Sequence, residues 1–423
     1  MSVQNDVAIV DAKDYQESTV NAAIDKMFAY LGLDPGNPFA GIIQPGMRVF
    51  IKPNWVASRW RTSCGHKGSI YSVITHPSVI EAVADRAAKA LNGRGELLIG
   101  DNPSIDADFD ELMELTQIRR LETKYSVPCK ILDLRPLICT NLNDYGKREK
   151  MIAQHGDPMG EVAVNLGQKS LLYSMDSSLF RGIFDERDET IAAHSKENQW
   201  YSFARSIYDA DVYISVPKLK THQKVGVTLN LKGLVGAVTQ KNQLVHWRIG
   251  TPETGGDEYP DTENLRAAQS AKVTHRGAWP GNDTIWRMVV DLYQGFLKKP
   301  NRTCFSIIDG ILAGEGQGPF CPTEKYAAVL IGGSNLLYTD IAAARYMGID
   351  PDQIRYLAYF MDRDNIHLNQ DISVSVNGNM DKNFFYADTR YKNFRVIEQW
   401  KNIKYGYHNT LVGAVYGTGQ EVE

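Results

Sequence analysis

The stretch Val212-Tyr213-Ile214-Ser215-Val216-Pro217-Lys218-Leu219-Lys220-Thr221-His222 decides the architecture of this chain. Its first five residues form an apolar run of the kind that makes a buried strand, and Pro217 ends that run. Similar runs, which predict further strands, occupy residues 7–10, 47–52, 97–101, 130–133, 305–309 and 326–331. Apolar residues recur at helical spacing over residues 15–31, 79–91, 284–297 and 336–347. Strands that alternate with helices predict an α/β fold with mixed or parallel sheets.

The chain of 423 residues is long enough for several units with buried cores. Between residues 136 and 205 the periodicity is weak and charges of both signs are mixed. We therefore expect two α/β lobes, at residues 1–135 and 206–350, separated by an irregular insertion at 136–205. Residues 351–423 are predicted to be a C-terminal extension packed on the core.

The composition of the chain argues against some classes of binding partner. The 46 Lys and Arg residues against 50 Asp and Glu residues give a net charge of −4, which does not favour binding to a phosphate backbone. No segment approaches the roughly 18 consecutive apolar residues of a membrane-spanning helix, and the first residues lack the features of a signal peptide. We therefore expect a soluble, cytoplasmic protein with no nucleic-acid or membrane partner.

The cysteines are few and widely spaced. The sequence contains five, an odd number, and their spacing suggests neither a disulfide framework nor a metal ribbon. They are Cys64, Cys129, Cys139, Cys304 and Cys321. Reduced, structural cysteines are the expectation.

The residues that follow the strand at 212–216 alternate in polarity. From Lys218 to Lys232 the even-numbered residues are polar or Gly, whereas Leu219 and the apolar residues from Val225 onward are odd-numbered. In an extended backbone, the even-numbered lysines, His222, Thr228 and Asn230 would share one face and attract an anion. An exposed strand whose lysines face water explains the same parity equally well. The position favours a site, because open α/β sheets bind ligands beyond the carboxyl ends of their strands.

Other candidates lie at strand ends and helix starts. Lys52 and Asn54 follow a predicted strand, and His76 precedes a predicted helix, where it either transfers a proton or bonds locally as a cap. Asp101 and Asp309 each end an apolar run, where a carboxylate holds a divalent metal, accepts a proton or caps a turn. Lys241 and His246 lie in a polar stretch, and the sequence leaves open whether they belong to the site or to the surface.

Together these motifs resemble a known family, the domain of unknown function 362. The matching motifs are Lys52 to Asn54, Thr75 to Pro77, Gly100-Asp101, Pro217 to His222, Gly226 to Gly233, Asp309 to Pro319 and Met347-Gly348. The resemblance implies little about activity. Some members of the family carry ferredoxin-like cysteine clusters, but this chain has no C-x-x-C, so an iron–sulfur cluster is not expected.

The segment from Gly226 to Gly236, with Lys232, is also similar to the nickel-pincer lactate racemase family. In that family a glycine-rich segment presents a lysine to a nucleotide-derived cofactor. A racemase-like enzyme of this kind is an alternative to the main hypothesis.

The main hypothesis is an enzyme that acts by acid–base chemistry on a small carboxylated or phosphorylated metabolite in a cleft between the lobes. The predicted catalytic residues are His76, His222, Lys220 and Lys232, with one lysine serving as base or nucleophile. The predicted substrate-binding residues are Lys52, Asn54, Lys218, Thr228, Asn230, Lys241 and His246. The predicted ligands of a magnesium-like metal are Asp101, Asp309 and Glu315. A binding protein without catalytic activity is the second alternative, and the sequence does not indicate the substrate or the oligomeric state.

Overall fold

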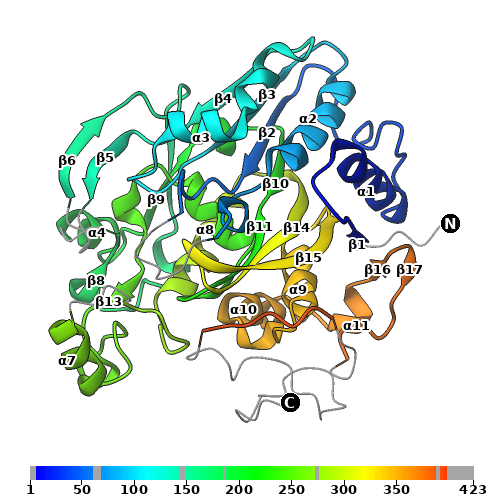
Figure 1. Cartoon of the computed structure of the whole chain (residues 1–423). Helices are drawn as coiled ribbons and strands as arrows, with labels where there is room; N and C mark the ends of the chain where they lie inside the picture. The colour runs from blue at the N-terminus through cyan, green and yellow to red at the C-terminus, as the bar shows by residue number, and fades with distance from the viewer. Residues whose placement is uncertain are drawn as a thin grey trace.

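One large mixed sheet organises the molecule (Figure 1). The computed structural model describes residues 6–60, 68–142, 148–183, 187–271, 276–386 and 391–397. In this part of the chain the sheet has 11 strands. Nine of them follow in the spatial order β17 (Asn379–Met380), β16 (Val374–Val376), β1 (Val7–Asp11), β15 (Cys321–Gly333), β14 (Thr303–Gln317), β10 (Val212–Val216), β2 (Arg48–Pro53), β3 (Glu96–Asp101) and β4 (Cys129–Asp133). The predicted α/β class is confirmed.

Strands from distant parts of the chain alternate in this sheet. β10 pairs in parallel with β2 on one side and with β14 on the other. β3 and β4 continue the parallel part, whereas β15 runs antiparallel to both β14 and β1. The segments 1–135 and 206–350 therefore share one sheet instead of forming two separate ones.

Helices cover both faces of the sheet, because side chains alternate along each strand. Ala8 and Val10 of β1 point into the core that contains α1 (Glu17–Tyr30), α2 (Pro77–Leu91) and α3 (Phe109–Thr116). Val7 and Ile9 point into the opposite core, which contains α8 (Ile285–Phe296), α9 (Leu336–Tyr346) and α10 (Arg355–Arg363). The predicted helices at 79–91, 284–297 and 336–347 correspond closely to α2, α8 and α9.

Most of the remaining elements lie on the side of the sheet away from β16 and β17, whereas α11 (Leu368–Asp371) lies beside those two strands (Figure 1). Three two-stranded sheets pair β5 (Leu137–Leu142) with β6 (Arg148–Ala153), β7 (Glu161–Asn165) with β9 (Trp200–Ala204), and β8 (Phe180–Arg181) with β13 (Trp247–Arg248). The shorter helices are α4 (Asp188–Ala193), α5 (Arg205–Tyr208), α7 (Thr262–Ala271) and α11. The predicted boundaries at residues 135, 205 and 350 stay predictions, and the extension beyond residue 397 lies outside the described residues.

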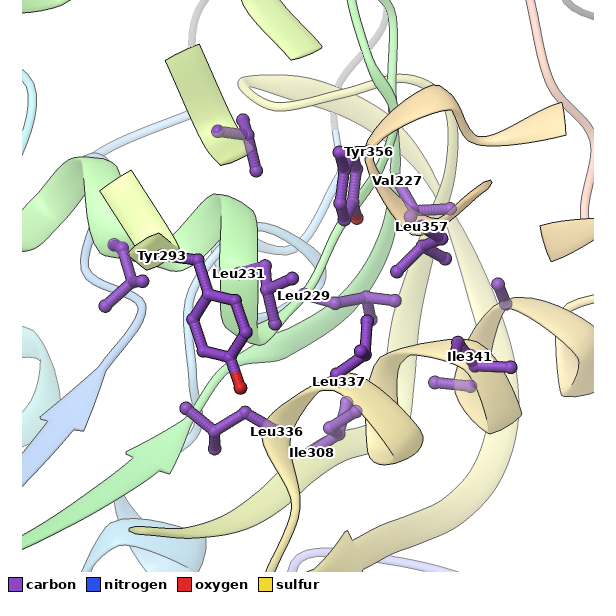
Figure 2. Packing of buried hydrophobic residues seen from close by; sticks show 14 of the residues in the cluster. Val227, Leu229, Leu231, Tyr293, Ile308, Leu336, Leu337, Ile341, Tyr356 and Leu357 are labelled. Atoms are coloured by element: carbon purple, nitrogen blue, oxygen red, sulfur yellow. The ribbon is translucent and has the colours of Figure 1, made fainter. Parts of the chain in front are cut away.

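The alternating stretch folds into a hairpin rather than one extended strand. β11 (Lys218–His222) pairs in parallel with β14 and antiparallel with β12 (Gly226–Thr228), and α6 (Asn230–Gly233) follows. The even-numbered residues stay on one face of the hairpin after the turn, because the register places Lys220 opposite Thr228 and His222 opposite Gly226. The odd-numbered residues enter the core: Figure 2 shows Val227, Leu229 and Leu231 packed among side chains of α8, α9 and α10.

The described cysteines differ in state. Cys129, Cys139 and Cys304 are not disulfide-bonded, as expected, whereas Cys321 is disulfide-bonded, which corrects the expectation for that residue. Cys64 lies outside the described residues.

In the described ranges, no helix combines the length and apolarity that crossing a bilayer requires. The cytoplasmic location stays a prediction.

Candidate functional site

The carboxyl ends of β2 and β3 lie at one edge of the sheet and carry an ion pair. Lys52 Nζ lies 2.7 Å from Asp101 Oδ1, and both side chains are buried. Asp101 also accepts hydrogen bonds from the backbone N–H groups of Trp55 (2.7 Å) and Asn102 (2.8 Å). The charge of Lys52 is thus neutralised inside the protein, so its predicted role as a free anion-binding lysine needs correction.

Gly236 packs directly against this ion pair. A Cβ at this position would overlap Asp101 Oδ1 and would lie 2.7 Å from Lys52 Nζ. We expect Gly236→Ala to lower the free energy of unfolding by about 1–3 kcal/mol, because the pair is buried and must move to make room. Urea unfolding measures this loss.

Gly233→Ala is the matched control. Gly233 has helical backbone angles (φ −59°), and a Cβ there would meet nothing within 4 Å. We expect this variant to keep its stability or gain roughly 0.5 kcal/mol. Equal losses in the two variants would contradict close packing at Gly236.

A second buried ion pair joins β11 to β14. Lys218 Nζ lies 2.5 Å from Asp309 Oδ2, and both side chains are 0% exposed. The Tyr15 hydroxyl donates to Asp309 Oδ1 (2.8 Å) and accepts from Lys218 Nζ (3.1 Å). The backbone N–H of His76 donates to Asp309 Oδ2 (2.9 Å). Because all these groups satisfy one another, Lys218 is a structural residue and not the predicted anion ligand.

His76 is the N-cap of α2. Its Nδ1 accepts a hydrogen bond from the Ser78 backbone N–H (3.2 Å), and its ring stacks on Tyr15 with 3.7 Å between centroids. Burial lowers the pKa of His76 to about 4, so the imidazole is neutral at pH 7. The local capping role is confirmed, and the proton-transfer role predicted for His76 is not supported by this geometry.

Beside these pairs lies a group of cationic side chains without carboxylate partners, which we call the cationic cluster. Its members are Lys220, His222, Lys224, Lys232, Lys241 and His246. Among the described residues, none of them forms an ion pair with a carboxylate. The sequence left open whether Lys241 and His246 belong to the site, and the structure places both in the cluster.

The lysines of the cationic cluster differ in how the protein holds them. Lys220 Nζ donates to the carbonyl oxygens of Val73 (2.7 Å) and Pro319 (3.1 Å). Lys241 Nζ donates to the carbonyl oxygen of Asn102 (2.9 Å), and Lys224 Nζ lies 4.0 Å from the ring centroid of Trp247. Lys232 Nζ has no hydrogen-bond partner among the described residues, although the side chain is only 8% exposed.

Burial lowers the pKa of every member of the cationic cluster, and neighbouring cations lower it further. The pKa falls to about 8 for Lys232 and to about 7 for Lys224 and Lys241. It falls well below the ordinary value for Lys220 and both histidines. Lys232 contributes to the lowering of the pKa at each of the other members.

The two histidines of the cluster present different nitrogen atoms. The backbone N–H of Lys224 donates to His222 Nδ1 (3.0 Å), so the proton of the neutral ring is on Nε2. His246 Nδ1 lies 2.8 Å from the carbonyl oxygen of Leu244, which only accepts, so Nδ1 carries the proton. His246 therefore offers an acceptor at Nε2, whereas His222 offers a donor there.

The asparagines and the threonine predicted to bind the substrate differ in their surroundings. Asn230 is fully buried; its amide donates to Asp340 Oδ1 (2.7 Å) and accepts from the Ser306 hydroxyl (2.9 Å). Asn230 is therefore structural, and this corrects its predicted substrate-binding role. Asn54 Nδ2 donates to the Val73 carbonyl (3.2 Å) that also binds Lys220, while the buried Thr228 hydroxyl has no partner among the described residues.

The predicted metal ligands do not converge. Glu315 accepts hydrogen bonds from Lys325 Nζ (3.2 Å) and from the backbone of Arg395 (2.9 Å), while Asp101 and Asp309 form the two ion pairs above. Over the described part of the chain, no three His, Cys, Asp or Glu side chains form a group that could hold a metal ion. The physical reason is that each carboxylate is already paired with a lysine or arginine.

Two contributors to the site were missed at the sequence level. Trp247 presents its ring to Lys224, and Asp340 anchors the start of α6, the helix that carries Lys232. Burial raises the pKa of Asp340 to about 7. No local motif marks either residue, although Asp340 was visible as an acidic residue early in a predicted apolar helix.

Comparisons with known proteins agree with the motifs. Residues 149–345 match the family model described as domain of unknown function (DUF362). The motifs at Lys52, Thr75, Gly100 and Met347 lie outside the matched residues.

Two further proteins are similar to the chain. A thylakoid-associated protein (sll1697) of Synechocystis sp. is 23% identical over 353 residues, which cover 83% of this chain and 77% of that protein. The lactate racemase apoprotein of Thermoanaerobacterium thermosaccharolyticum overlaps with a TM-score of 0.36 and 10% identity. That overlap covers 82% of this chain, which spans 57% of the length of the racemase. Over residues 149–345 the chain is therefore similar to the DUF362 family.

Proposed function

We propose that the chain is an enzyme that binds a small anionic metabolite, carboxylated or phosphorylated, at the cationic cluster and transfers a proton on it. The observation that carries this proposal is Lys232, a residue only 8% exposed whose amine has no hydrogen-bond partner among the described residues and whose charge lowers the pKa of the other members of the cluster. Buried charges are ordinarily paired. An anion supplies the partner that the protein does not.

The protein prepares the cluster for such a ligand. Lys220 and Lys241 are oriented by backbone carbonyl groups, which leave other N–H donors on each ammonium group unused. The members Lys224, Lys241 and His246 keep partial exposure, which gives a small molecule a route to the group. Preorganised donors of this kind bind an anion without rearranging around it.

His246 is the proposed proton acceptor. Burial and the neighbouring lysines keep its pKa well below 6.5, so Nε2 is unprotonated when the site is empty. A bound anion opposes the field of the lysines and raises this pKa toward neutral pH, which is the range that acid–base catalysis requires. The Nε2–H group of His222 is placed to donate to the same ligand.

Anion binding should be coupled to proton uptake. In the empty protein the pKa values of Lys232, Lys224 and Lys241 are about 8, 7 and 7, and a bound anion raises them. The affinity should therefore fall as the pH rises from about 7 to about 9, by roughly tenfold per unit for each proton taken up. Below about pH 6 these lysines are protonated in both states, so their contribution levels off.

Calorimetric titration measures this effect with sulfate and malonate, in buffers of different ionisation enthalpy. Lys26→Met, which removes an exposed lysine of α1, is the control and should bind as the wild type does. Affinity that is independent of pH, or absent for both anions, would rule out the cationic cluster as the binding site.

The same titration in deuterium oxide separates an enzyme from a binding protein. An enzyme should exchange a carbon-bound proton of a bound carboxylate, which proton magnetic resonance detects, and His246→Asn should abolish this exchange. If ligands bind but no proton exchanges, the non-catalytic alternative is correct. The nickel-pincer alternative stays a prediction from the sequence.

A further inference from the structure

Lys232 differs from the other lysines of the cationic cluster in what surrounds its amine. Two carbonyl oxygens hold Lys220, one holds Lys241, and an aromatic ring faces Lys224. Lys232 Nζ has no such contact in the described chain. A lysine amine without such contacts contributes little to the stability of the fold, and it is available to react with a ligand.

The backbone that carries Lys232 is held firmly. Asp340 accepts hydrogen bonds from the N–H groups of Asn230 (2.8 Å) and Leu231 (2.9 Å) at the start of α6. The Lys232 side chain therefore extends from a fixed base, while its amine has no hydrogen-bond partner among the described residues.

From this arrangement we infer that Lys232 is a covalent catalytic residue, whose amine forms an imine with the carbonyl carbon of a 2-oxo acid while neighbouring cations bind the carboxylate. The inference rests on the proposed anion-binding function and specifies its substrate class. A 2-oxo acid fits because its anionic group and its electrophilic carbon are adjacent, as are the cations and the amine.

The step balances without any oxidant or reductant. The lone pair of neutral Nζ attacks the carbonyl carbon, a nitrogen–carbon bond forms, and the carbonyl π electrons move to oxygen, which takes up a proton. Nζ releases a proton, the carbinolamine oxygen is protonated again, and the carbon–oxygen bond breaks as water leaves. The product is the protonated imine plus one water molecule, with a net uptake of one proton, which returns to a neighbouring amine if the imine becomes neutral.

The cluster supplies what this step needs. Burial, with a smaller effect of the nearby Lys52, brings the pKa of Lys232 to about 8, so a useful fraction of the amine is neutral at pH 7. Lys224 and Lys241, with pKa values of about 7, can give and take the protons of the carbinolamine stage.

Reductive trapping tests the inference. The full chain is incubated separately with glyoxylate, pyruvate and 2-oxoglutarate in the presence of sodium cyanoborohydride, which converts an imine into a stable secondary amine. Mass spectrometry of the intact protein and of its peptides then locates the adduct. We expect one adduct, on Lys232, formed roughly tenfold faster or more than on an exposed lysine such as Lys26, because more of the amine is neutral.

Two comparisons make the result specific. Malonate carries carboxylates but no ketone, so an excess should block the Lys232 adduct and leave slow surface labelling unchanged. Lys232→Arg should lose the adduct, whereas Lys26→Arg should keep it. The peptide map of the wild-type chain decides the question even where Lys232→Arg folds poorly.

The possible outcomes distinguish failure of the covalent role of Lys232 from failure of the anion-binding function. If malonate binds but no 2-oxo acid labels Lys232, the covalent role is overturned while the anion-binding function stands. If labelling falls only on exposed lysines and no anion binds, both are overturned. A malonate-sensitive adduct on Lys232 supports both.

Discussion

Replacing Lys232 with Met is expected to stabilise the empty protein and to remove most of its affinity for anions. Lys232 is a buried cation among other cations, and Met has a similar length without charge. Removing the mutual repulsion and the desolvated charge should raise the free energy of unfolding by about 1–3 kcal/mol. The anion loses a charge-assisted hydrogen bond from the Lys232 amine, which should weaken binding roughly 10- to 100-fold.

Urea unfolding and calorimetric titration with sulfate measure the two effects on the same preparation. Lys26→Met is the matched control, because it removes a lysine that is exposed on α1, and it should change neither quantity appreciably. Opposite signs for stability and binding are typical of a residue kept for function. A Lys232→Met protein that is both less stable and unchanged in affinity would show that Lys232 is structural.

The second large effect is expected at the ion pair between β11 and β14. Asp309→Asn keeps the shape of the side chain but leaves the Lys218 ammonium, which is 0% exposed, without a carboxylate. We expect the free energy of unfolding to fall by about 3–5 kcal/mol, because an uncompensated buried charge is costly. Thermal and urea unfolding both report this loss.

The double variant Lys218→Met/Asp309→Asn is the control. It removes the charge together with its partner. The Asn oxygen can still accept from the backbone N–H of His76, as Oδ2 of Asp309 does, while the Asn NH2 group takes the position of Oδ1 and can donate to the Tyr15 hydroxyl. Most of the lost stability should return. A double variant as unstable as Asp309→Asn alone would indicate that Lys218 contributes through its packing rather than through its charge.

The contrast between Lys232 and Lys218 explains why the site could be predicted only in part. Both lysines have even numbers in the same alternating stretch, and nothing local distinguishes them. Their difference lies in Asp309, which is 91 residues from Lys218 and reaches it only because β11 pairs with β14. Lys52 is likewise paired with Asp101, which lies on the neighbouring strand β3.

The histidines show the same limit at the level of single atoms. His222 and His246 were both recognised as candidates, but their roles depend on which ring nitrogen carries the proton. That depends on whether the nearby backbone group is the N–H of Lys224 or the carbonyl of Leu244. A sequence pattern does not show which of these groups a ring nitrogen meets.

The amino-acid sequence by itself determined the α/β class, the main strands and helices, and the separation of Leu219, Val227 and Leu231 from the polar residues beside them. The two-residue spacing of a strand and the 3.6-residue spacing of a helix are local features of the sequence. Burial of the apolar face that either spacing creates stabilises the element wherever it lies in the fold. Only the tertiary structure decided that the two predicted lobes share one sheet and which lysines remain unpaired. Those outcomes depend on strand pairing and on charges brought together from distant segments, and the cost of burying a cation is set by everything around it.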